Sequence, residues 1–410
     1  MTKALQRPSL WLITLIVALP QVSETIYTPS LPDIARALYT SNSMVEYTLT
    51  VFLFGFAVGV LLWGNLSDRI GRRPTLLIAI SIYIMGCIGC WFSSSITMLM
   101  FFRFIQAFGG SVGSVVGQTI TRDCFASHER GKIFSTISIA LSCSPSLGPI
   151  LGGLIDQYFG WGAVFLVLTI LGTCTFMSVF LKLSETNKMP TKASFSETLK
   201  GMRKVLMDKK VLSFGFLIGV TNGILFSLYG EAPFYMIEIL GLKPSEYGFL
   251  YLFAGGAFVS GGWMSRYLSI KKYQNKLLLL IGNGVILFSA STWAVCAYLG
   301  MISSNHGFFS ILLTVGFIMA LFFGVSIIIP NALSHALEDY KHMAGTAAST
   351  FGFYYYILIS VVTFGMGSLH NGTVIPMPFY FVSLSFLMCL VYYLGLHEPG
   401  IHLKTNPDNL

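Results

Sequence analysis

The sequence predicts an all-α integral membrane protein whose twelve helices cross the bilayer in two groups of six. Three observations carry this prediction: the composition, the spacing of the apolar stretches and the placement of the basic residues. Hydrophobic residues make up 54% of the 410 residues and charged residues only 10%, whereas a soluble globular domain has about 25% charged residues. The chain is therefore too apolar for water to be its main solvent.

Twelve apolar stretches are long enough to span a bilayer, since a helix needs roughly 20 predominantly apolar residues to cross the hydrocarbon core. They cover residues 10–30, 45–66, 74–94, 97–119, 133–155, 161–182, 211–239, 246–268, 276–299, 307–330, 343–369 and 376–396. No alternating strand pattern runs through them, so an outer-membrane barrel is not expected. The first stretch follows Lys3 and Arg7 as a signal peptide would, but it continues to Tyr27 without a clear cleavage site. We therefore expect an uncleaved first helix.

Basic residues predict the orientation, because Lys and Arg in short loops stay on the cytoplasmic side. With the N-terminus in the cytoplasm, nearly all of the 25 Lys and Arg residues fall in cytoplasmic segments. Arg36 and Lys243 lie on the other side, and Arg103 lies within a helix. The sequence thus predicts a multi-pass protein of the cell inner membrane with both termini cytoplasmic. The net charge of +8 follows from this topology and gives no reason to expect a nucleic-acid partner.

The longest polar interval divides the spans into six and six. We expect an N-terminal six-helix half over residues 1–183, a cytoplasmic central loop over 184–210 and a C-terminal six-helix half over 211–410. The stretches "GNLSDRIGRR" from Gly64 and "GWMSRYLSIKK" from Gly262 both follow the second span of a half. They share a Gly and a Ser followed by basic residues, which favours an internal duplication.

The densest charge cluster of the chain lies between the second and third spans. Its candidate gating residues are Gly64, Asp68, Arg69, Gly71, Arg72 and Arg73. An acid here can complement the N-terminus of a facing helix, and the glycines permit a sharp turn and close approach. A positive-inside anchor would account for the arginines, but it would leave Asp68 and the glycines unexplained.

This loop resembles the signature of the major facilitator superfamily. Further stretches resemble its drug:proton antiporters of the bicyclomycin and chloramphenicol resistance type: "IYTPSLPDIARAL" from Ile26, "RFIQAFGGSVG" from Arg103, "SPSLGPILGG" from Ser144 and "AGTAAST" from Ala344. The resemblance covers essentially the whole chain. It implies the major facilitator fold and export of small amphipathic compounds or drugs in exchange for protons, with the loop bracing the cytoplasmic ends of the halves.

The antiporter-type helix motif comprises Pro145, Gly148, Pro149, Gly152 and Gly153. The prolines remove helix donors and bend the helix, and the glycines allow neighbouring backbones to touch. A hinge for a rocking bundle and plain close packing would give the same pattern. Ser144 stands where the fuller motif of the resembling group has Gly, which departs from the antiporter pattern.

Glu24 and Glu231 are the candidate proton-coupling residues, because both lie within predicted spans. A carboxyl group in hydrocarbon favours its protonated form, which suits proton exchange; the alternative is a hydrogen bond to a neighbouring helix. The resembling group usually has its acid where Thr25 stands, and one residue rotates a side chain by roughly 100°. We therefore expect the role to have moved to Glu231, with Glu24 as partner or substitute, and Glu46 and Glu238 near the outer ends.

Polar residues on the same helices are the candidate substrate-cavity residues. They are Gln21, Thr25, Tyr27, Thr28, Arg103, Gln106, Ser227 and Tyr235. A charged residue at membrane depth usually faces a cavity or a partner. We therefore expect Arg103 to handle substrate or protons, or else to act as a structural post.

No sequence pattern indicates an enzyme: H-E-x-x-H, P-loop and nucleophile-elbow motifs do not occur. Cys87 and Cys90 lie in an apolar helix, where core packing is favoured over redox or metal chemistry, and the seven histidines are scattered, mostly in loops. We expect a monomer without cofactor or metal, whose partners are a small-molecule substrate, protons and the bilayer. One alternative is a proton-coupled uptake or export permease for a specific metabolite or siderophore. Another is a non-transporting membrane receptor or assembly partner, although no loop is long enough for a large soluble sensory domain.

Overall fold

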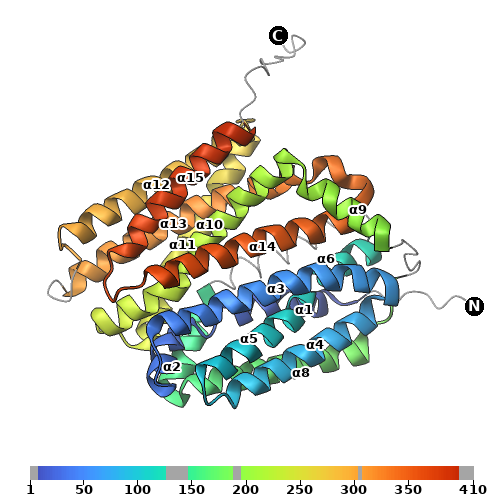
Figure 1. Cartoon of the computed structure of the whole chain (residues 1–410), viewed down its shortest axis with the longest axis horizontal. Coiled ribbons are helices and arrows are strands. Elements are labelled where there is room, and N and C mark those ends of the chain that lie inside the picture. Colours follow the sequence, from blue (N-terminus) through green and yellow to red (C-terminus); the bar gives the residue numbers. More distant parts are fainter. Residues whose placement is uncertain (1–7, 126–145, 188–194, 303–306, 397–410) are drawn as a thin grey trace, which may run out of the picture.

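A computed structural model describes residues 8–125, 146–187, 195–302 and 307–396. These residues form a bundle of helices without a β-strand (Figure 1). The first group comprises α1 (Leu10–Thr25), η1 (Thr28–Ser30), α2 (Leu31–Ala37), α3 (Asn42–Ile70), α4 (Arg72–Trp91), α5 (Ile96–Gly110), α6 (Val112–Cys124), the helical residues 146–159 and α8 (Trp161–Lys182). The second comprises α9 (Phe195–Leu206), α10 (Lys209–Pro233), η2 (Phe234–Ile239), α11 (Pro244–Ile270), α12 (Asn275–Tyr298), α13 (Gly307–Ala336), η4 (Glu338–Met343), α14 (Ala344–Leu369) and α15 (Pro376–Leu396).

The predicted all-helical membrane fold is confirmed. Ten helical segments of the described residues are long and apolar enough to cross a membrane. The predicted span 246–268 corresponds to α11, which has 27 residues but is rich in Gly, Ser and Tyr. The predicted span 133–155 is described only from residue 146, where the chain is helical. The structure is thus consistent with twelve spans.

Local chemistry explains where several helices begin and change. α3 begins after Ser41, whose Oγ accepts a hydrogen bond from Met44 N at 3.4 Å. α10 begins after Asp208, which accepts one from Lys210 N at 2.8 Å, and such caps satisfy amides that have no helical partner. At the other end of α10, Pro233 has no N–H to donate, and the chain continues as the π-helical turn η2.

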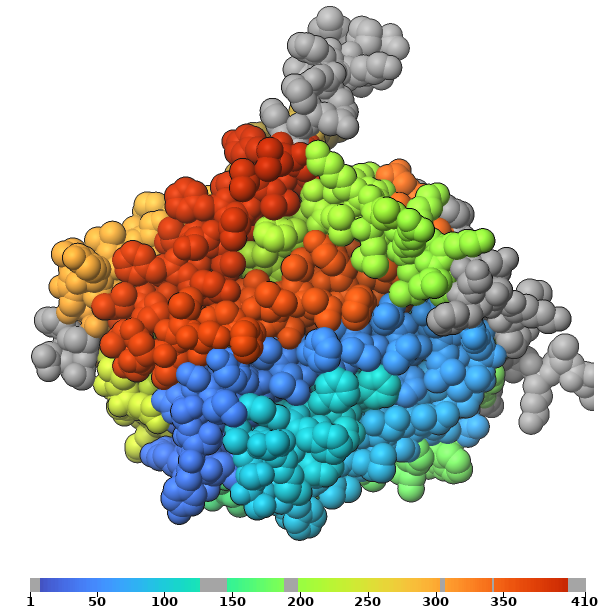
Figure 2. Space-filling model, in the orientation of Figure 1, coloured from blue at the N-terminus to red at the C-terminus, as the bar shows by residue number. Residues whose placement is uncertain are grey.

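The two groups of helices meet along α3 and α14, which lie side by side (Figures 1 and 2). A Cβ on Gly352 of α14 would lie 2.8 Å from Val60 Cγ1 of α3, so the absent side chain allows the two backbones to approach. Ser360 Oγ also donates to Thr50 O at 3.0 Å across this seam. The boundaries of the two halves at residues 183 and 211 stay a prediction.

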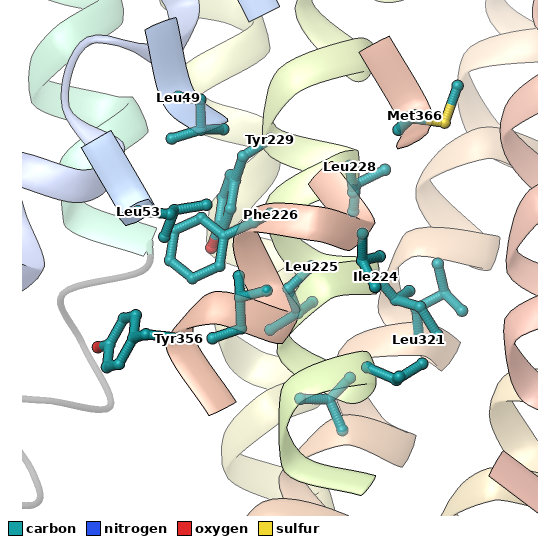
Figure 3. Packing of buried hydrophobic residues seen from close by; sticks show 14 of the residues in the cluster. Leu49, Leu53, Ile224, Leu225, Phe226, Leu228, Tyr229, Leu321, Tyr356 and Met366 are labelled. Carbon is teal, nitrogen blue, oxygen red and sulfur yellow. The ribbon is translucent and has the colours of Figure 1, made fainter. Parts of the chain in front are cut away.

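Apolar side chains from both groups form the core beside this seam. Figure 3 shows Leu49 and Leu53 of α3 facing Phe226 and Tyr229 of α10. Leu321 of α13 and Met366 of α14 complete this part, and both are fully buried. Large apolar residues such as Phe101, Phe180 and Phe288 are also exposed on the outside of the bundle, as expected for helices whose outer faces contact lipid.

We call the two ends of the bundle the basic end and the far end. The basic end carries Arg69, Arg72 and Arg73 together with α9. The far end carries the α2–α3 turn, the segment between η2 and α11, and His370 after α14.

Candidate functional site

Two adjoining cavities lie between the two groups of helices. The smaller, about 270 Å³, is lined by Gln21, Glu24 and Thr25 of α1 and by residues of α10, α13 and α14. The larger, about 540 Å³, extends to Asp68, Arg122 and Asp123 at the basic end. Both are lined by Leu333, Tyr355 and Tyr356. Together they form a path from the middle of the bundle toward the basic end.

Glu24 is the carboxylate on the wall of the smaller cavity. Its residue is only 3% exposed, and its Oε1 has no hydrogen-bond partner among the described residues. Three tyrosines, Tyr229, Tyr355 and Tyr356, line the same cavity. Because an unpartnered buried carboxylate oxygen is costly, Glu24 is suited to bind a proton or a cationic ligand.

Arg103 lies elsewhere, inside the first group of helices. Its guanidinium carbon lies 3.8 Å from the ring centroid of Tyr27 and 4.1 Å from that of Phe52. Its Nη1 donates to Gln106 Oε1 at 2.6 Å. Neither Arg103 nor Gln106 lines the two cavities, because aromatic side chains surround the guanidinium. In this conformation Arg103 packs among aromatic side chains rather than on a cavity wall, and its part in substrate or proton handling stays a prediction.

The other predicted cavity residues divide in the same way. Gln21 and Thr25 line the smaller cavity, whereas the remaining polar groups are buried within the packed helices. Tyr27 OH lies 3.3 Å from Thr48 Oγ1, and Tyr235 OH lies 3.1 Å from Thr314 Oγ1. Thr28 donates to Thr25 O at 2.9 Å, and Ser227 Oγ is buried without a partner in the described part of the chain.

Glu231 belongs to a cluster at the far end and does not line either cavity. His370 Nδ1 lies 3.0 Å and 2.9 Å from the two carboxylate oxygens of Glu231, and 3.4 Å from Glu46 Oε1. The hydrogen bond with Glu231 raises the pKa of His370. In this conformation Glu231 does not share a cavity with Glu24, because it comes two residues before the end of α10 and contacts residues of the far end. Its part in proton coupling stays a prediction.

Sequence reasoning missed His370 and the role of Glu46. His370 is separated from Glu231 by 139 residues, and no local pattern relates the two. The sequence indicated only the depth of Glu46 in the membrane. Because Glu46 follows closely after Ser41, which caps α3, it had to lie near an outer end of the bundle.

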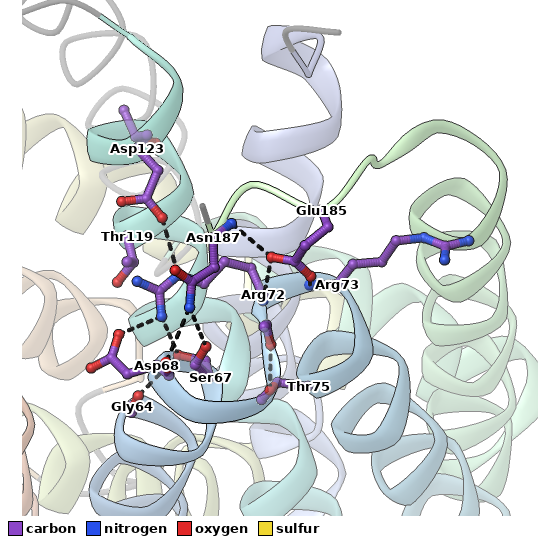
Figure 4. Close-up of polar contacts among 12 residues, drawn as sticks. Gly64, Ser67, Asp68, Arg72, Arg73, Thr75, Thr119, Asp123, Glu185 and Asn187 are labelled. Atoms are coloured by element: carbon purple, nitrogen blue, oxygen red, sulfur yellow. Dashed lines mark hydrogen bonds and ion pairs between the residues drawn. The ribbon is translucent and has the colours of Figure 1, made fainter. Parts of the chain in front are cut away.

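At the basic end, the candidate gating residues form a network around Arg72 (Figure 4). The Arg72 guanidinium donates to Asp123 Oδ2 at 3.0 Å, to Ser67 Oγ at 3.1 Å and to Asp68 Oδ1. The second oxygen of Asp68 lies 3.5 Å from the position of a Cβ on Gly345, in the first turn of α14. Asp68 therefore faces the N-terminus of a helix from the other group, where a negative charge is favourable.

Glu185 is a further member of this network that the sequence did not single out. Its carboxylate oxygens accept hydrogen bonds from Arg72 N at 2.9 Å and Arg73 N at 3.0 Å (Figure 4). These amides belong to the first two residues of α4. Glu185, which follows α8 in the sequence, therefore caps the N-terminus of α4. Arg73 Nη2 also donates to Phe180 O at 2.8 Å. Arg69 is exposed at the end of α3.

The glycine-rich helix motif closes the far end. A Cβ on Gly152 would lie 1.6 Å from Ile26 O, and one on Gly153 would lie 2.2 Å from Pro244 O. A Cβ on Gly148 would lie 2.0 Å from Thr25 Oγ1, and Pro149 O approaches Gly248 of α11 closely. Pro145 and Ser144 lie outside the described residues. The motif thus packs against both groups of helices, so the conformation is closed at the far end while its cavities extend toward the basic end.

Comparisons with known proteins agree with this architecture. A family model described as Major Facilitator Superfamily matches residues 11–363. An uncharacterized transporter of Rickettsia bellii is 34% identical over 385 residues, which are 93% of this chain and 95% of the relative. A bicyclomycin resistance protein homolog of Haemophilus influenzae is 27% identical over 379 residues, 92% of each chain.

A solved structure has the same fold. The xylose transporter XylE of Escherichia coli, in a partially occluded inward open conformation, aligns with a TM-score of 0.70 at 14% identity and covers 96% of this chain and 98% of its own. The family model and the curated relatives confirm the resemblance that the motifs indicated. They also confirm the prediction that the protein is a transporter and not an enzyme. The chain belongs to the Major Facilitator Superfamily of membrane transporters.

Proposed function

We propose that the protein exports small amphipathic compounds, drugs among them, across the inner membrane in exchange for protons, by alternating access. The observation that carries the proposal is Glu24, a buried carboxylate with an unpartnered oxygen on the wall of a cavity between the two groups of helices. The bicyclomycin resistance protein homolog among the relatives supports export of a toxic compound.

Competition at Glu24 accounts for the coupling. A protonated carboxyl is cheap to bury, whereas an ionised one requires water or a cation. The groups that face it are Tyr229, Tyr355 and Tyr356, which are polar but uncharged, and the attraction of the Arg103 charge also acts on it. A bound amphipathic cation and a proton would therefore replace each other at one group. Each charge moved across 100 mV is worth about 2.3 kcal/mol.

Glu231 is the less suitable carrier for this direct competition, because it does not line the cavities in this conformation. The aromatic walls around Glu24 suit flat or amphipathic solutes, since cations interact favourably with the faces of such rings. We place the basic end in the cytoplasm, so the cavity would load substrate from inside the cell.

Inverted membrane vesicles energised by a pH gradient provide the test. Across a panel of cationic and neutral antibiotics and dyes, the parent should drive uptake of at least one compound. Glu24→Gln should abolish the pH-gradient dependence and weaken binding of cationic solutes more than of neutral ones. Glu338→Gln changes an acid on the surface at the basic end and should transport as the parent does.

Three outcomes count against the proposal. If no compound of a broad panel moves in the parent, export is contradicted. If Glu24→Gln retains full proton-coupled transport, the proton is carried elsewhere. Accumulation of a nutrient or siderophore in intact cells, without resistance to any toxic compound, would assign the protein to uptake instead.

A further inference from the structure

The cluster of Glu46, Glu231 and His370 joins the two groups of helices at the far end. Glu46 lies on α3 and Glu231 on α10, and His370 is the residue that follows α14. Glu46 is 1% exposed and Glu231 is 2% exposed, while the His370 side chain is 11% exposed. Two buried acids thus lie with one imidazole that reaches the surface.

Small residues make room for the Glu46 carboxylate between α10 and α14. A Cβ on Gly230 would lie 3.6 Å from Glu46 Oε2, and one on Gly367 would lie 3.3 Å from the same oxygen. Despite its burial, neither oxygen of Glu46 makes a hydrogen bond within the described residues. Its Oε1 lies 3.4 Å from His370 Nδ1, and the carboxylate of Glu231 lies beside it. A buried acceptor aimed into the cluster is therefore left without a donor.

Three ligand atoms of the cluster lie close enough together to surround one metal ion. One oxygen of each acid and one nitrogen of His370 all lie within 4.8 Å of one another. Atoms bound tetrahedrally at about 2.0–2.2 Å from Zn²⁺ lie roughly 3.3–3.6 Å apart. The observed separations of 2.9 Å and 3.4 Å from His370 Nδ1 need only small adjustments to meet this geometry.

The charges match as well. Two ionised carboxylates repel each other in a buried site, and a single imidazole cannot neutralise both. A divalent cation would displace the proton that His370 Nδ1 shares with Glu231 and release it to solvent. Two carboxylates and one neutral imidazole around the cation then leave no net charge, and the cation supplies the partner that Glu46 lacks. An imidazole nitrogen favours Zn²⁺ and its first-row neighbours over Mg²⁺ or Ca²⁺, which prefer oxygen ligands alone.

We propose that Glu46, Glu231 and His370 bind a divalent first-row transition cation such as Zn²⁺ at the far end of the bundle. The ion would link α3 of the first group to α10 and the end of α14 in the second. Because the three ligands come from both groups, the site is complete only while the far end is closed. Bound metal would therefore hold this conformation.

Metal titration of the purified full-length protein tests the site. After removal of metal with a chelator, one equivalent of Co²⁺ should bind per chain. The bound Co²⁺ should give the visible absorption bands of a low-coordinate site, and added Zn²⁺ should abolish these bands by displacing it. Glu46→Gln and His370→Asn should each weaken Zn²⁺ at least tenfold, because even the loss of an outer-shell partner lowers metal affinity by about 10–100-fold.

A matched control is available at the basic end. His335 Nδ1 lies 2.8 Å from Glu338 Oε1, but this pair is partly exposed, and no second acid completes a metal-binding group there in the described chain. His335→Asn should bind Zn²⁺ as the parent does. Glu46→Asp keeps both charges and withdraws the carboxylate by one methylene, so it tests the geometry in a variant expected to fold.

Two results would overturn the site. One is the absence of saturable Co²⁺ or Zn²⁺ binding by the parent. The other is equal affinity in the parent, Glu46→Asp and His370→Asn, which would place the metal on other surface groups. These measurements need no transported substrate, so their failure is separate from a failure of the proposed export.

Discussion

Gly71→Ala should destabilise the protein more than an ordinary glycine substitution, for two separate reasons. Gly71 has φ +106° and ψ 161°, a conformation that L side chains rarely adopt and that costs on the order of 1–3 kcal/mol. In addition, the new Cβ would lie 2.5 Å from Glu185 Oε2 and 2.8 Å from its Cδ. The carboxylate must therefore move.

Moving Glu185 removes the cap of α4. Its oxygens accept hydrogen bonds from the amides of Arg72 and Arg73 at 2.9 Å and 3.0 Å. Losing an N-terminal cap costs about 0.5–2 kcal/mol, and because Glu185 is exposed we take roughly 1 kcal/mol. Together with the backbone strain, Gly71→Ala should lower the free energy of unfolding by about 2–4 kcal/mol.

Gly160 separates these two contributions. It has φ +78° and ψ 165° and precedes α8 as Gly71 precedes α4, but a Cβ there would meet no atom within 4 Å. Gly160→Ala should therefore show the strain alone. Glu185→Ala should show the loss of the cap alone, about 1 kcal/mol.

A double-mutant cycle in mixed micelles, with unfolding by a denaturing detergent, measures the coupling. Gly71→Ala combined with Glu185→Ala should cost less than the sum of the single variants by about 1 kcal/mol, because the displaced cap is counted only once. Additivity within about 0.3 kcal/mol would refute the reasoning, and so would equal effects of Gly71→Ala and Gly160→Ala.

Three further substitutions test other parts of the structure. Asp68→Asn should fold and insert normally but slow transport at least about fivefold, equivalent to roughly 1 kcal/mol, because a neutral amide complements the N-terminus of α14 less well; vesicle assays at parental rates would reduce the cluster to a topology anchor. Arg103→Lys should lower thermal stability by roughly 1–2 kcal/mol, since an ammonium cannot stack as a planar fork between Tyr27 and Phe52; an unchanged melting curve would contradict this. Gly152→Ala should cost about 1–3 kcal/mol because its Cβ would meet Ile26 O at 1.6 Å. Gly256→Ala, with nothing within 4 Å, should be neutral or stabilising in the same measurement, because Ala favours a helix over Gly.

The fold was predictable because the bilayer imposes a pattern on the sequence. Apolar stretches near 20 residues long and basic residues between them suffice to place helices such as α3 and α10. Irregular details followed less directly. The break between α5 and α6 after Gly110, and the π-helical turn after Pro233, depend on packing that hydropathy does not report.

Single-helix periodicity located candidate residues but could not say which face met the cavity. Arg103 and Glu24 both lie on polar stripes, yet Tyr27, Phe52 and Phe165 surround the arginine, whereas the carboxylate lines the space between the groups. A stripe predicts that a residue avoids lipid. Whether it then meets a cavity or a neighbouring helix depends on contacts between distant segments.

The far-end cluster shows the same limit more sharply. The sequence predicts no metal site, because metal sites are recognised in sequence by ligands at short, regular spacings. Glu46, Glu231 and His370 come from three helices or their ends. Only tertiary packing brings them within 4.8 Å.

The two sets of acids differ in how they depend on conformation. Glu24 lines a cavity between the two groups of helices, which alternating access would present to each side in turn, so its access to water would change between the two conformations. Glu46 and Glu231 belong to different groups of helices, so their cluster with His370 forms only when those groups meet at the far end. Coupling between sites is reciprocal: if a solute at Glu24 favours opening of the far end, it must weaken metal binding there by the same factor by which the metal weakens solute binding. The metal affinity of the far-end cluster would thus depend on the conformation that solute binding at Glu24 favours.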